Sequence, residues 1–535
     1  MSLLENTELR KHVGQLMVIG FNGTTASEEI KELIRDHHVG GIILFGRNIG
    51  SPKEILHLTN ELQRTAKEAG HEQPLLICID QENGVVRRLG EGTTIFPGAM
   101  LLGATDDSEN AYKVGYATGE ELKALGINWN LAPVVDVNNN AENPVIGVRS
   151  FGESAESVAA FGKMAVKGMQ DAGVITTLKH FPGHGDTNVD SHLDLPIISH
   201  DMDRLMEIEL KPFLENIKAG ADTVMSAHVY FPAIEDDAGV PATLSKKVIT
   251  GLLREKLHFD GVVTTDCLEM NAIANTIGTA KGGVEAIKAG VDIVMVSHRH
   301  HLQKDTIEAI IAAVEASEIP SFKLLEAVGR VKRLKDKYVS WDELNLNKDP
   351  QVPAVVGSEE HIQIANEIYK QGITIVKNNG ILPLTKNQKT LVIYSENTYT
   401  MQAEDKRYSS LYLGKIVQEI DPTAEVVQLS NPATDEEISA VSQQAKDFDA
   451  IIVGTLTVRP RDQQVKLIET LCDTGVPVIV AATRSPYDLA YLPNVDAYVC
   501  TYEYPYPALK MAVKAIYGIE NVTGKLPVTI PTSHQ

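Results

Sequence analysis

Short apolar segments rich in β-branched residues alternate with longer segments of helical periodicity from the start of the chain to about residue 338. The helical segments include Ser27–His37, Pro52–Ala69, Ser154–Ala172 and Ser245–Leu257. This alternation predicts parallel strands that are each followed by a covering helix. Eight strand candidates are present, which is the number that closes a parallel barrel. They are Gln15–Ile19, Gly41–Phe45, Leu75–Ile79, Asn128–Leu131, Val174–Leu178, Thr223–Ser226, Gly261–Thr265 and Asp292–Val296.

A second unit of the same kind follows after a break in the pattern. A helical segment over Phe322–Tyr338 ends the first unit, and residues 340–356, which contain Trp341, Pro350 and Pro353, are typical of an extended linker. We therefore expect an α/β protein with a (β/α)₈ TIM-type barrel over residues 1–339, a linker over 340–356, and a C-terminal three-layer α/β sandwich domain over 357–535. The strand candidates of the second unit are Gly372–Lys377, Leu391–Tyr394, Asp449–Gly454, Val476–Ala482 and Ala497–Cys500.

Composition narrows the class of protein and its partners. The net charge of −22 argues against nucleic acid and against anionic membranes, because both bind basic surfaces. The N-terminus has no uninterrupted apolar region of the kind found in signal peptides, and no apolar run is long enough to span a bilayer. The four cysteines are scattered along apolar segments, as expected for free thiols in a reducing compartment. These features predict a cytoplasmic protein with no membrane or nucleic-acid partner, and they leave its oligomeric state unknown.

Polar residues stand just beyond several of the predicted barrel strands. They are Asp80, Lys179, His180, His228, Asp266 and His298. The active site of a (β/α)₈ barrel is built at the C-terminal ends of its strands. This placement predicts a catalytic barrel, with these residues gathered at one mouth.

The densest group of titratable residues lies in the loop Lys179–His192, which holds three histidines and two aspartates. Asp190 precedes His192 by two residues, a spacing that lets the carboxylate accept a hydrogen bond from one ring nitrogen and leaves the other free for acid–base chemistry. Two other interpretations are a structural loop and a metal site made of His180, His184 and His192. Barrel metallohydrolases place a paired histidine motif after the first strand, where this chain has Gly20-Phe21-Asn22-Gly23, so metal is the weaker interpretation.

Asp266 is the second candidate for chemistry. It ends the apolar segment Gly261–Thr265, which places a carboxylate at the rim of the barrel. A single aspartate after a strand is as often a helix N-cap as a catalytic group. Because Asp266 occurs together with the histidine loop, the role of catalytic nucleophile is favoured over that of a helix cap.

These motifs resemble glycoside hydrolase family 3, specifically its bacterial β-N-acetylglucosaminidase (β-hexosaminidase) branch. The resemblance is carried by Lys179–Thr187 with Asp190-Ser191-His192, by Asp80–Leu89, by Asn143–Gly152, and in the second unit by Gly372–Leu384 and Gly524–Pro531. It implies that Asp190 and His192 form an acid/base dyad and that Asp266 is the nucleophile. It also implies sugar-hydroxyl contacts from Asp80, Arg88, Arg149, Lys179 and His180. Asn83 and Val85 replace a glycine and an arginine common in the family's motif, which leaves the details of binding around Asp80 open.

The resemblance predicts a retaining exo-β-N-acetylglucosaminidase that works by double displacement without metal or cofactor. Its expected substrates are oligosaccharides containing N-acetylglucosamine (GlcNAc), with terminal GlcNAc released from muropeptide disaccharides or chitooligosaccharides. One alternative is a phosphorylase, since a neutral histidine does not repel phosphate. A β-glucosidase of the same family and a non-enzymatic sugar-binding protein are the others, and the second domain is expected to have a structural role.

Overall fold

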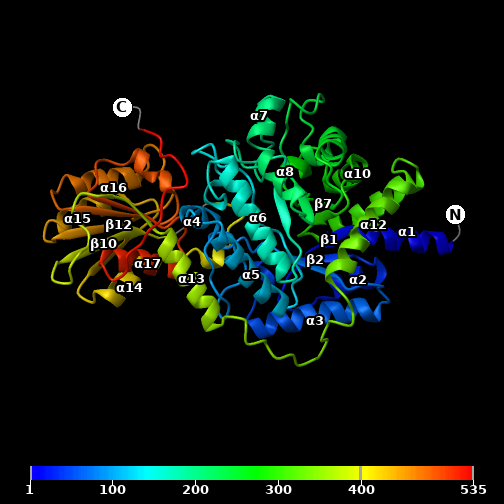
Figure 1. Ribbon diagram of the computed structural model, residues 1–535, viewed down its shortest axis with the longest axis horizontal. Coiled ribbons are helices and arrows are strands. Elements are labelled where there is room, and N and C mark those ends of the chain that lie inside the picture. The colour runs from blue at the N-terminus through cyan, green and yellow to red at the C-terminus, as the bar shows by residue number, and fades with distance from the viewer. Residues whose placement is uncertain (1–2, 397–400, 533–535) are drawn as a thin grey trace.

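The computed structural model describes residues 3–396 and 401–532, and Figure 1 shows a barrel unit on one side and a smaller α/β unit on the other. Each pair of hydrogen-bonded neighbours among the barrel strands is parallel, in the orders β4-β3-β2-β1-β8 and β5-β6-β7. The parallel bridges Trp129–Ile175 and Thr264–Ile293 join these two groups into a closed ring. The expected eight-stranded barrel is confirmed. Its strands are β1 (Met17–Ile19), β2 (Gly41–Leu44), β3 (Leu76–Ile79), β4 (Trp129–Asn130), β5 (Thr177–Phe181), β6 (Thr223–Ser226), β7 (Val262–Thr265) and β8 (Val294–Val296).

The barrel strands are apolar runs because both of their faces are covered. Every residue of these eight strands is buried. The fully buried indole of Trp129 has a partner in the interior, because its nitrogen donates to Thr177 Oγ1 at 2.7 Å.

Helices cover the outside of the barrel (Figure 1), and some of them begin with a side-chain cap. Ser27 caps α2, and Ser51 forms a capping box with Glu54 at the start of α3. The helices of this unit are α1 (Leu3–Gln15), α2 (Glu28–Asp36), α3 (Pro52–Glu68), α4 (Ala99–Ala104), α5 (Glu109–Ala124), α6 (Ala155–Asp171), α7 (Met202–Glu207), α8 (Lys211–Lys218), the π-helix η4 (Lys247–Lys256), α9 (Asn271–Ala274), α10 (Thr279–Ala289), α11 (His300–Glu315) and α12 (Ser321–Tyr338). Single 3₁₀ turns lie at η1 (Gly46–Asn48), η2 (Gly147–Arg149) and η3 (Ala242–Leu244).

The second unit is an α/β sandwich around one sheet with the order β11-β10-β12-β13-β14-β9, in which only the β14–β9 pair is antiparallel. Helix α14 packs with α17 and α15 packs with α16, which gives the two helical layers (Figure 1). Its strands are β9 (Thr374–Asn378), β10 (Thr390–Ser395), β11 (Glu425–Leu429), β12 (Ala450–Thr455), β13 (Val478–Ala482) and β14 (Ala497–Cys500). Its helices are α13 (Glu359–Gly372), η5 (Lys406–Tyr408), α14 (Leu413–Ile420), α15 (Asp435–Ala445), α16 (Gln463–Cys472), η6 (Pro486–Tyr491) and α17 (Tyr506–Ile516).

The segment between α12 and α13 has neither helix nor strand and runs along the barrel. Trp341 Nε1 donates to the carbonyl oxygens of His71 and Glu72, at 3.2 and 3.1 Å. Arg64 donates to the carbonyl oxygens of Leu346 and Asn347. The domain limits 1–339, 340–356 and 357–535 stay a prediction.

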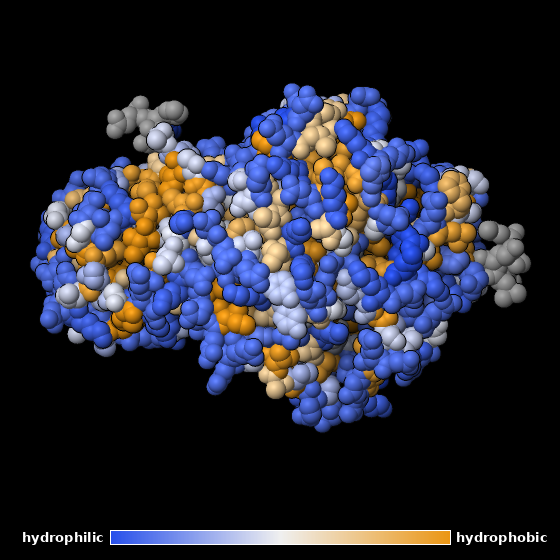
Figure 2. Space-filling model, viewed as in Figure 1, coloured by the Kyte–Doolittle hydropathy of each residue, from blue (hydrophilic) through white to orange (hydrophobic). Residues whose placement is uncertain are grey.

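The face of the molecule in Figure 2 is mostly hydrophilic, with hydrophobic residues in small groups. Among the helices of the described residues, none combines the length and the apolarity that crossing a membrane would need.

Candidate active site

A cleft of about 310 Å³ opens at the C-terminal ends of the barrel strands. It collects polar side chains from the ends of β3, β5 and β7, the loop after β5, and a segment of the second domain. All eight residues predicted for the site lie near or in this cleft, and seven of them line it directly. The lining includes Asp80, Glu82, Arg88, Arg149, Lys179, His180, His184, Ser191, His192, Asp266, Cys267, His298 and residues 402–405.

One wall of the cleft is a buried network of charges around Glu82. Lys179 Nζ lies 2.7 Å from Glu82 Oε1 and 2.9 Å from Asp80 Oδ1. Arg149 binds Glu82 with two hydrogen bonds, at 2.9 and 2.7 Å. Burial alone would raise the pKa of Glu82, but Arg149 and Lys179 beside it hold that pKa well below its usual range. Glu82 therefore orients both cations, a role that the sequence did not reveal.

Replacement of Glu82 by alanine should strongly destabilise the fold. It would leave Lys179 and Arg149 buried without their shared counter-ion, and breaking a buried pair costs about 3–5 kcal/mol. Because the pKa of Glu82 is lowered in the folded protein, its contribution is present in full above about pH 4.3, the value for an unfolded chain, and is lost as the pH falls through the folded value. Denaturant unfolding at pH 7 and pH 3 measures both effects.

Glu91→Ala is the matched control, because this glutamate is exposed. Its free energy of unfolding should stay within about 0.5 kcal/mol of the original. Equal stability of the two variants at pH 7 would contradict the role given to Glu82.

Asp136 is a second residue that the sequence did not reveal. Its side chain is fully buried and accepts the backbone N–H groups of His180 and His184 and, at 2.8 Å, the Nδ1–H of His180. Burial opposes the charge of Asp136, but the hydrogen bond and charge of His180 keep its pKa below the usual value. Asp136 thus fixes the start of the loop and leaves Nε2 of His180 to face the cleft.

Asp190 and His192 form the pair expected from their spacing. His192 Nδ1 lies 2.7 Å from Asp190 Oδ1, and the same oxygen accepts the backbone N–H of His192 at 2.9 Å. Burial raises the pKa of Asp190, but the hydrogen bond from His192 outweighs it, so the carboxyl is ionised at neutral pH. The His192 side chain is 29% exposed, and its Nε2 is left available to a ligand in the cleft.

Asp266 follows β7 and lines the cleft. Its Oδ1 accepts the backbone N–H of Cys267 at 2.7 Å. Burial would raise the pKa of Asp266, yet the neighbouring His228, His180 and His192 bring it below the usual value. The carboxylate is therefore charged and, with no arginine or lysine bound to it among the described residues, can act as a nucleophile.

His228, which the sequence placed after β6, is part of the support. It is fully buried, and its Nε2–H donates to the carbonyl oxygen of Cys267 at 3.0 Å, while Nδ1 meets Thr243 Oγ1 at 2.8 Å. Burial lowers the pKa of His228, and the charge of Asp266 opposes that shift. It holds the segment that follows Asp266.

The second domain contributes to the site as well as to the fold. Residues 402–405 line the cleft, and Arg407 Nη2 and Tyr408 OH both donate to the carbonyl oxygen of Arg88 at 2.8 Å. The guanidinium of Arg87 lies 3.8 Å from the centre of the Tyr408 ring. These contacts hold the backbone of a predicted sugar-binding residue, so the second domain lines part of the cleft and supports its wall.

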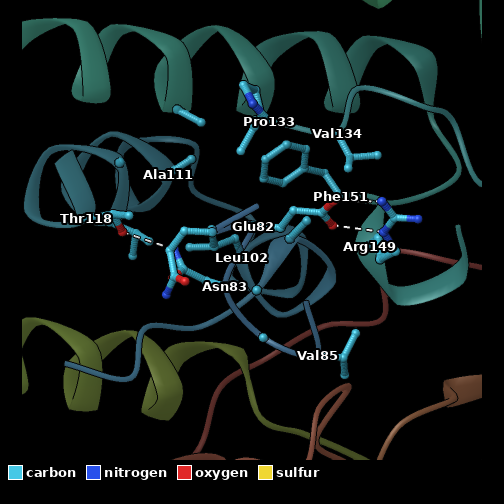
Figure 3. Close-up of a pocket in the computed structure, with 18 of the residues that line it drawn as sticks. Glu82, Asn83, Val85, Leu102, Ala111, Thr118, Pro133, Val134, Arg149 and Phe151 are labelled. Carbon is cyan, nitrogen blue, oxygen red and sulfur yellow. Dashed lines mark hydrogen bonds and ion pairs between the residues drawn. The ribbon is translucent and has the colours of Figure 1, made fainter. Parts of the chain in front are cut away.

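The two departures from the family's motif lie outside this cleft. Asn83 and Val85 line a smaller internal cavity of about 40 Å³, shown in Figure 3, and neither is among the described residues that line the larger cleft. Asn83 has φ of 71°, in the left-handed region that glycine and asparagine tolerate, and donates to Thr118 Oγ1 at 3.0 Å. Val85 is buried in the core. Neither substituted side chain therefore lines the cleft beside Asp80.

Two groups of side chains in the described part of the chain have the mutual distances of a metal site. They are Cys267–Glu269–His298 and Asp186–His200–Glu209. In each, an arginine already compensates the carboxylates: Arg299 lies 2.9 Å from Glu269, and Arg204 lies 3.4 Å from Glu209. Neither group is the three-histidine set considered from the sequence, whose His184 uses both ring nitrogens in hydrogen bonds within the loop.

Comparisons with known proteins agree on one family. The model of the glycosyl hydrolase family 3 N-terminal domain matches residues 8–334, and that of the C-terminal domain matches residues 373–535. β-Hexosaminidase A of Pseudoalteromonas piscicida is 33% identical over 95% of this chain and 92% of its own length. A β-hexosaminidase of Xylella fastidiosa (strain M23) is 37% identical over 55% of this chain and 87% of its own length.

Among solved structures, a glycoside hydrolase family 3 β-N-acetylglucosaminidase from Paenibacillus sp. str. FPU-7 is similar over 100% of both chains, with a TM-score of 0.92 and 40% identity. The two family models together match most of the chain, and the Pseudoalteromonas piscicida and Paenibacillus proteins match it over nearly its whole length. The chain therefore belongs to glycosyl hydrolase family 3, as a glycoside hydrolase related to bacterial β-hexosaminidases.

Proposed function

We propose that this protein is a retaining exo-β-N-acetylglucosaminidase that removes terminal GlcNAc from chitooligosaccharides or muropeptide disaccharides. The observation that carries the proposal is the meeting, in one cleft, of the Asp190–His192 pair with the partly buried, ionised Asp266. A carboxylate nucleophile and a separate proton donor are the two groups that double displacement requires.

In the first step an oxygen of Asp266 attacks the anomeric carbon, and His192 gives its Nε2 proton to the departing oxygen. Asp190 holds Nδ1 and stabilises the charged imidazole before the transfer. In the second step the neutral His192 takes a proton from water, whose oxygen displaces Asp266 from the anomeric carbon. Each step inverts the anomeric carbon, so the product retains the configuration of the substrate. His192 gives one proton in the first step and takes one from water in the second.

The buried wall of charges is proposed to bind the hydroxyls of the terminal sugar. Asp80 and Lys179 are fixed by ion pairs, and Arg88 lies near Asp80, with 3.9 Å between Nη2 and Oδ2. Held donors and acceptors of this kind can bind adjacent hydroxyls with two hydrogen bonds each. His180 and Arg149 line the same wall. The cleft's volume is at the lower end of small-molecule sites, which supports removal of one end sugar.

A rate comparison tests the proposal: para-nitrophenyl N-acetylglucosaminide, chitobiose and a muropeptide disaccharide, each in inert buffer and in phosphate. Hydrolysis with retention and no rate gain in phosphate is the expected result, and the better natural disaccharide identifies the substrate. Formation of a sugar phosphate would support the phosphorylase, and cleavage of glucosides instead would support a β-glucosidase. Failure to cleave any β-N-acetylglucosaminide would overturn the proposal in favour of a sugar-binding protein.

We also propose a cytoplasmic location. All four cysteines are free, and Cys78 and Cys500 are buried in the two cores. Free buried thiols fit a reducing compartment.

Treatment with a chelator should leave activity unchanged, because the proposed steps need only side chains. The measurement is turnover before and after dialysis against EDTA, with zinc added back as the control. Loss on chelation with recovery on zinc would instead support a metal site at the mouth of the barrel.

A further inference from the structure

The turn that carries the proposed acid/base pair, residues 188–194, has few contacts that could fix it in place. Its flanking side chains Val189 and Leu193 are 36% and 64% exposed. Its backbone hydrogen bonds, as far as the structure describes them, stay inside the turn, from the N–H groups of Leu193 and Asp194 to the carbonyl oxygen of Asp190. Asp190 and Ser191 between them are buried, at 6% and 3% exposed, so what holds these two residues decides where the catalytic group lies.

Apart from the bond from the Leu195 N–H to Asp194 Oδ1 at its edge, one hydrogen bond joins this turn to the rest of the described chain. It connects Ser191 Oγ to His184 Nε2 at 3.0 Å. Both residues are buried, with exposed fractions of 3% and 2%. Ser191 stands between Asp190 and His192, so its hydroxyl fixes the centre of the pair.

The direction of this hydrogen bond follows from the neighbours of His184. The hydroxyl of Thr187 donates to the carbonyl oxygen of His184 at 3.1 Å, so it accepts from Nδ1–H, at 2.8 Å. Burial lowers the pKa of His184 to about 4, so the ring carries one proton near neutrality. That proton is on Nδ1, and Nε2 accepts the hydroxyl proton of Ser191.

His184 is itself firmly held. Its backbone N–H donates to Asp136 Oδ1 at 2.8 Å, and Asn143 Nδ2 donates to its carbonyl oxygen at 2.9 Å. Asp136 also binds His180 on the wall of the cleft. A continuous chain of hydrogen bonds thus runs from that wall, through Asp136 and His184, to Ser191.

We propose that His184 is a positioning residue whose neutral imidazole holds Ser191, and through it the Asp190–His192 pair, over the anomeric centre. The inference rests on the proposed function, in which His192 is the acid. It accounts for both the second histidine of the loop and the serine between Asp190 and His192. Misplacement of a catalytic group by about 1 Å can cost about 100-fold in rate, so the single anchor matters.

The anchor can be tested without catalysis by hydrogen exchange of the peptide that covers residues 188–194. Ser191→Ala should speed its exchange by about three- to tenfold, the loss of one hydrogen bond, while the peptide of strand β5 stays unchanged. Ser191→Thr keeps the hydroxyl and should restore protection. Leu193→Ala, in the same turn but exposed, is the matched control and should change little. If hydrogen exchange of this peptide were unchanged in Ser191→Ala, the anchoring role would be wrong, whether or not the proposed function holds.

The kinetic test uses two leaving groups. Ser191→Ala should lower kcat about tenfold on chitobiose, whose leaving alcohol needs a proton, and change KM by no more than about twofold. On a dinitrophenyl glycoside, which needs no acid, the glycosylation rate should be nearly unchanged. A raised KM with unchanged kcat would mean that Ser191 binds substrate, and equal losses on both substrates would mean a structural role. If the wild-type protein were inactive on both substrates, the proposed function would be wrong, and the hydrogen-exchange result would still decide this inference.

Discussion

Asp266→Ala should fold normally and lose turnover of a β-N-acetylglucosaminide by about 10⁴-fold or more, as removal of a nucleophile does in other covalent mechanisms. Asp266 follows β7 at the wall of the cleft, and its one protein hydrogen bond among the described residues comes from the backbone N–H of Cys267. Its removal breaks no salt bridge, so stability should change little. A loss of turnover would therefore reflect the missing nucleophile and not a loss of folded protein.

The measurement pairs steady-state kinetics with labelling of the intermediate. A fluorinated substrate that slows the second step should attach to Asp266, and peptide mapping locates the label. Asp260→Ala is the matched control, because this aspartate precedes the same strand and its side chain is 89% exposed. A label on another carboxylate, or activity retained by Asp266→Ala, would contradict the assignment.

The barrel could be predicted because its strands are buried on both faces and so appear as continuous apolar runs. The prediction was least accurate where polar residues continue a strand. Strand β5 was expected over Val174–Leu178 but spans Thr177–Phe181, so Lys179 and His180 lie within the strand and not after it. Strand β11 was not predicted at all, because it is an edge strand with partly exposed positions.

Asp80, Lys179, His180 and Asp266 could be predicted because strand ends converge on one mouth, whereas Arg88 and Arg149 were expected only from the family resemblance. Their supports could not. Glu82 and Asp136 act as buried counter-ions, and which cation a carboxylate meets depends on the packing of loops that are distant in sequence. Residues 402–405 come from the other domain, as do Arg407 and Tyr408, and no pattern in the sequence links either group to the cleft or to Arg88.

His192→Ala should slow reactions only as far as the leaving group needs a proton. On chitobiose, with a poor leaving alcohol, the first step should fall by about 10²–10⁴-fold, the usual contribution of general acid catalysis. On a dinitrophenyl glycoside the first step should be nearly normal. The second step, which needs the same histidine as a base, should then limit the rate, so the covalent intermediate should accumulate and be visible by mass spectrometry.

Azide distinguishes an acid/base role from a binding role. It is a nucleophile that needs no base, so it should restore turnover of the dinitrophenyl glycoside by His192→Ala and give the β-glycosyl azide, while the exposed His301→Ala remains like wild type.

Asp190→Ala should show a milder form of the same pattern, because it removes the 2.7 Å partner of Nδ1 but keeps the imidazole. Equal losses on both leaving groups without azide rescue would mean that His192 only binds substrate. The acid would then be sought at His184 or Asp186. Of the two, His184 lines the cleft but engages both ring nitrogens within the loop, whereas Asp186 is paired with His200 and is not among the described residues that line the cleft.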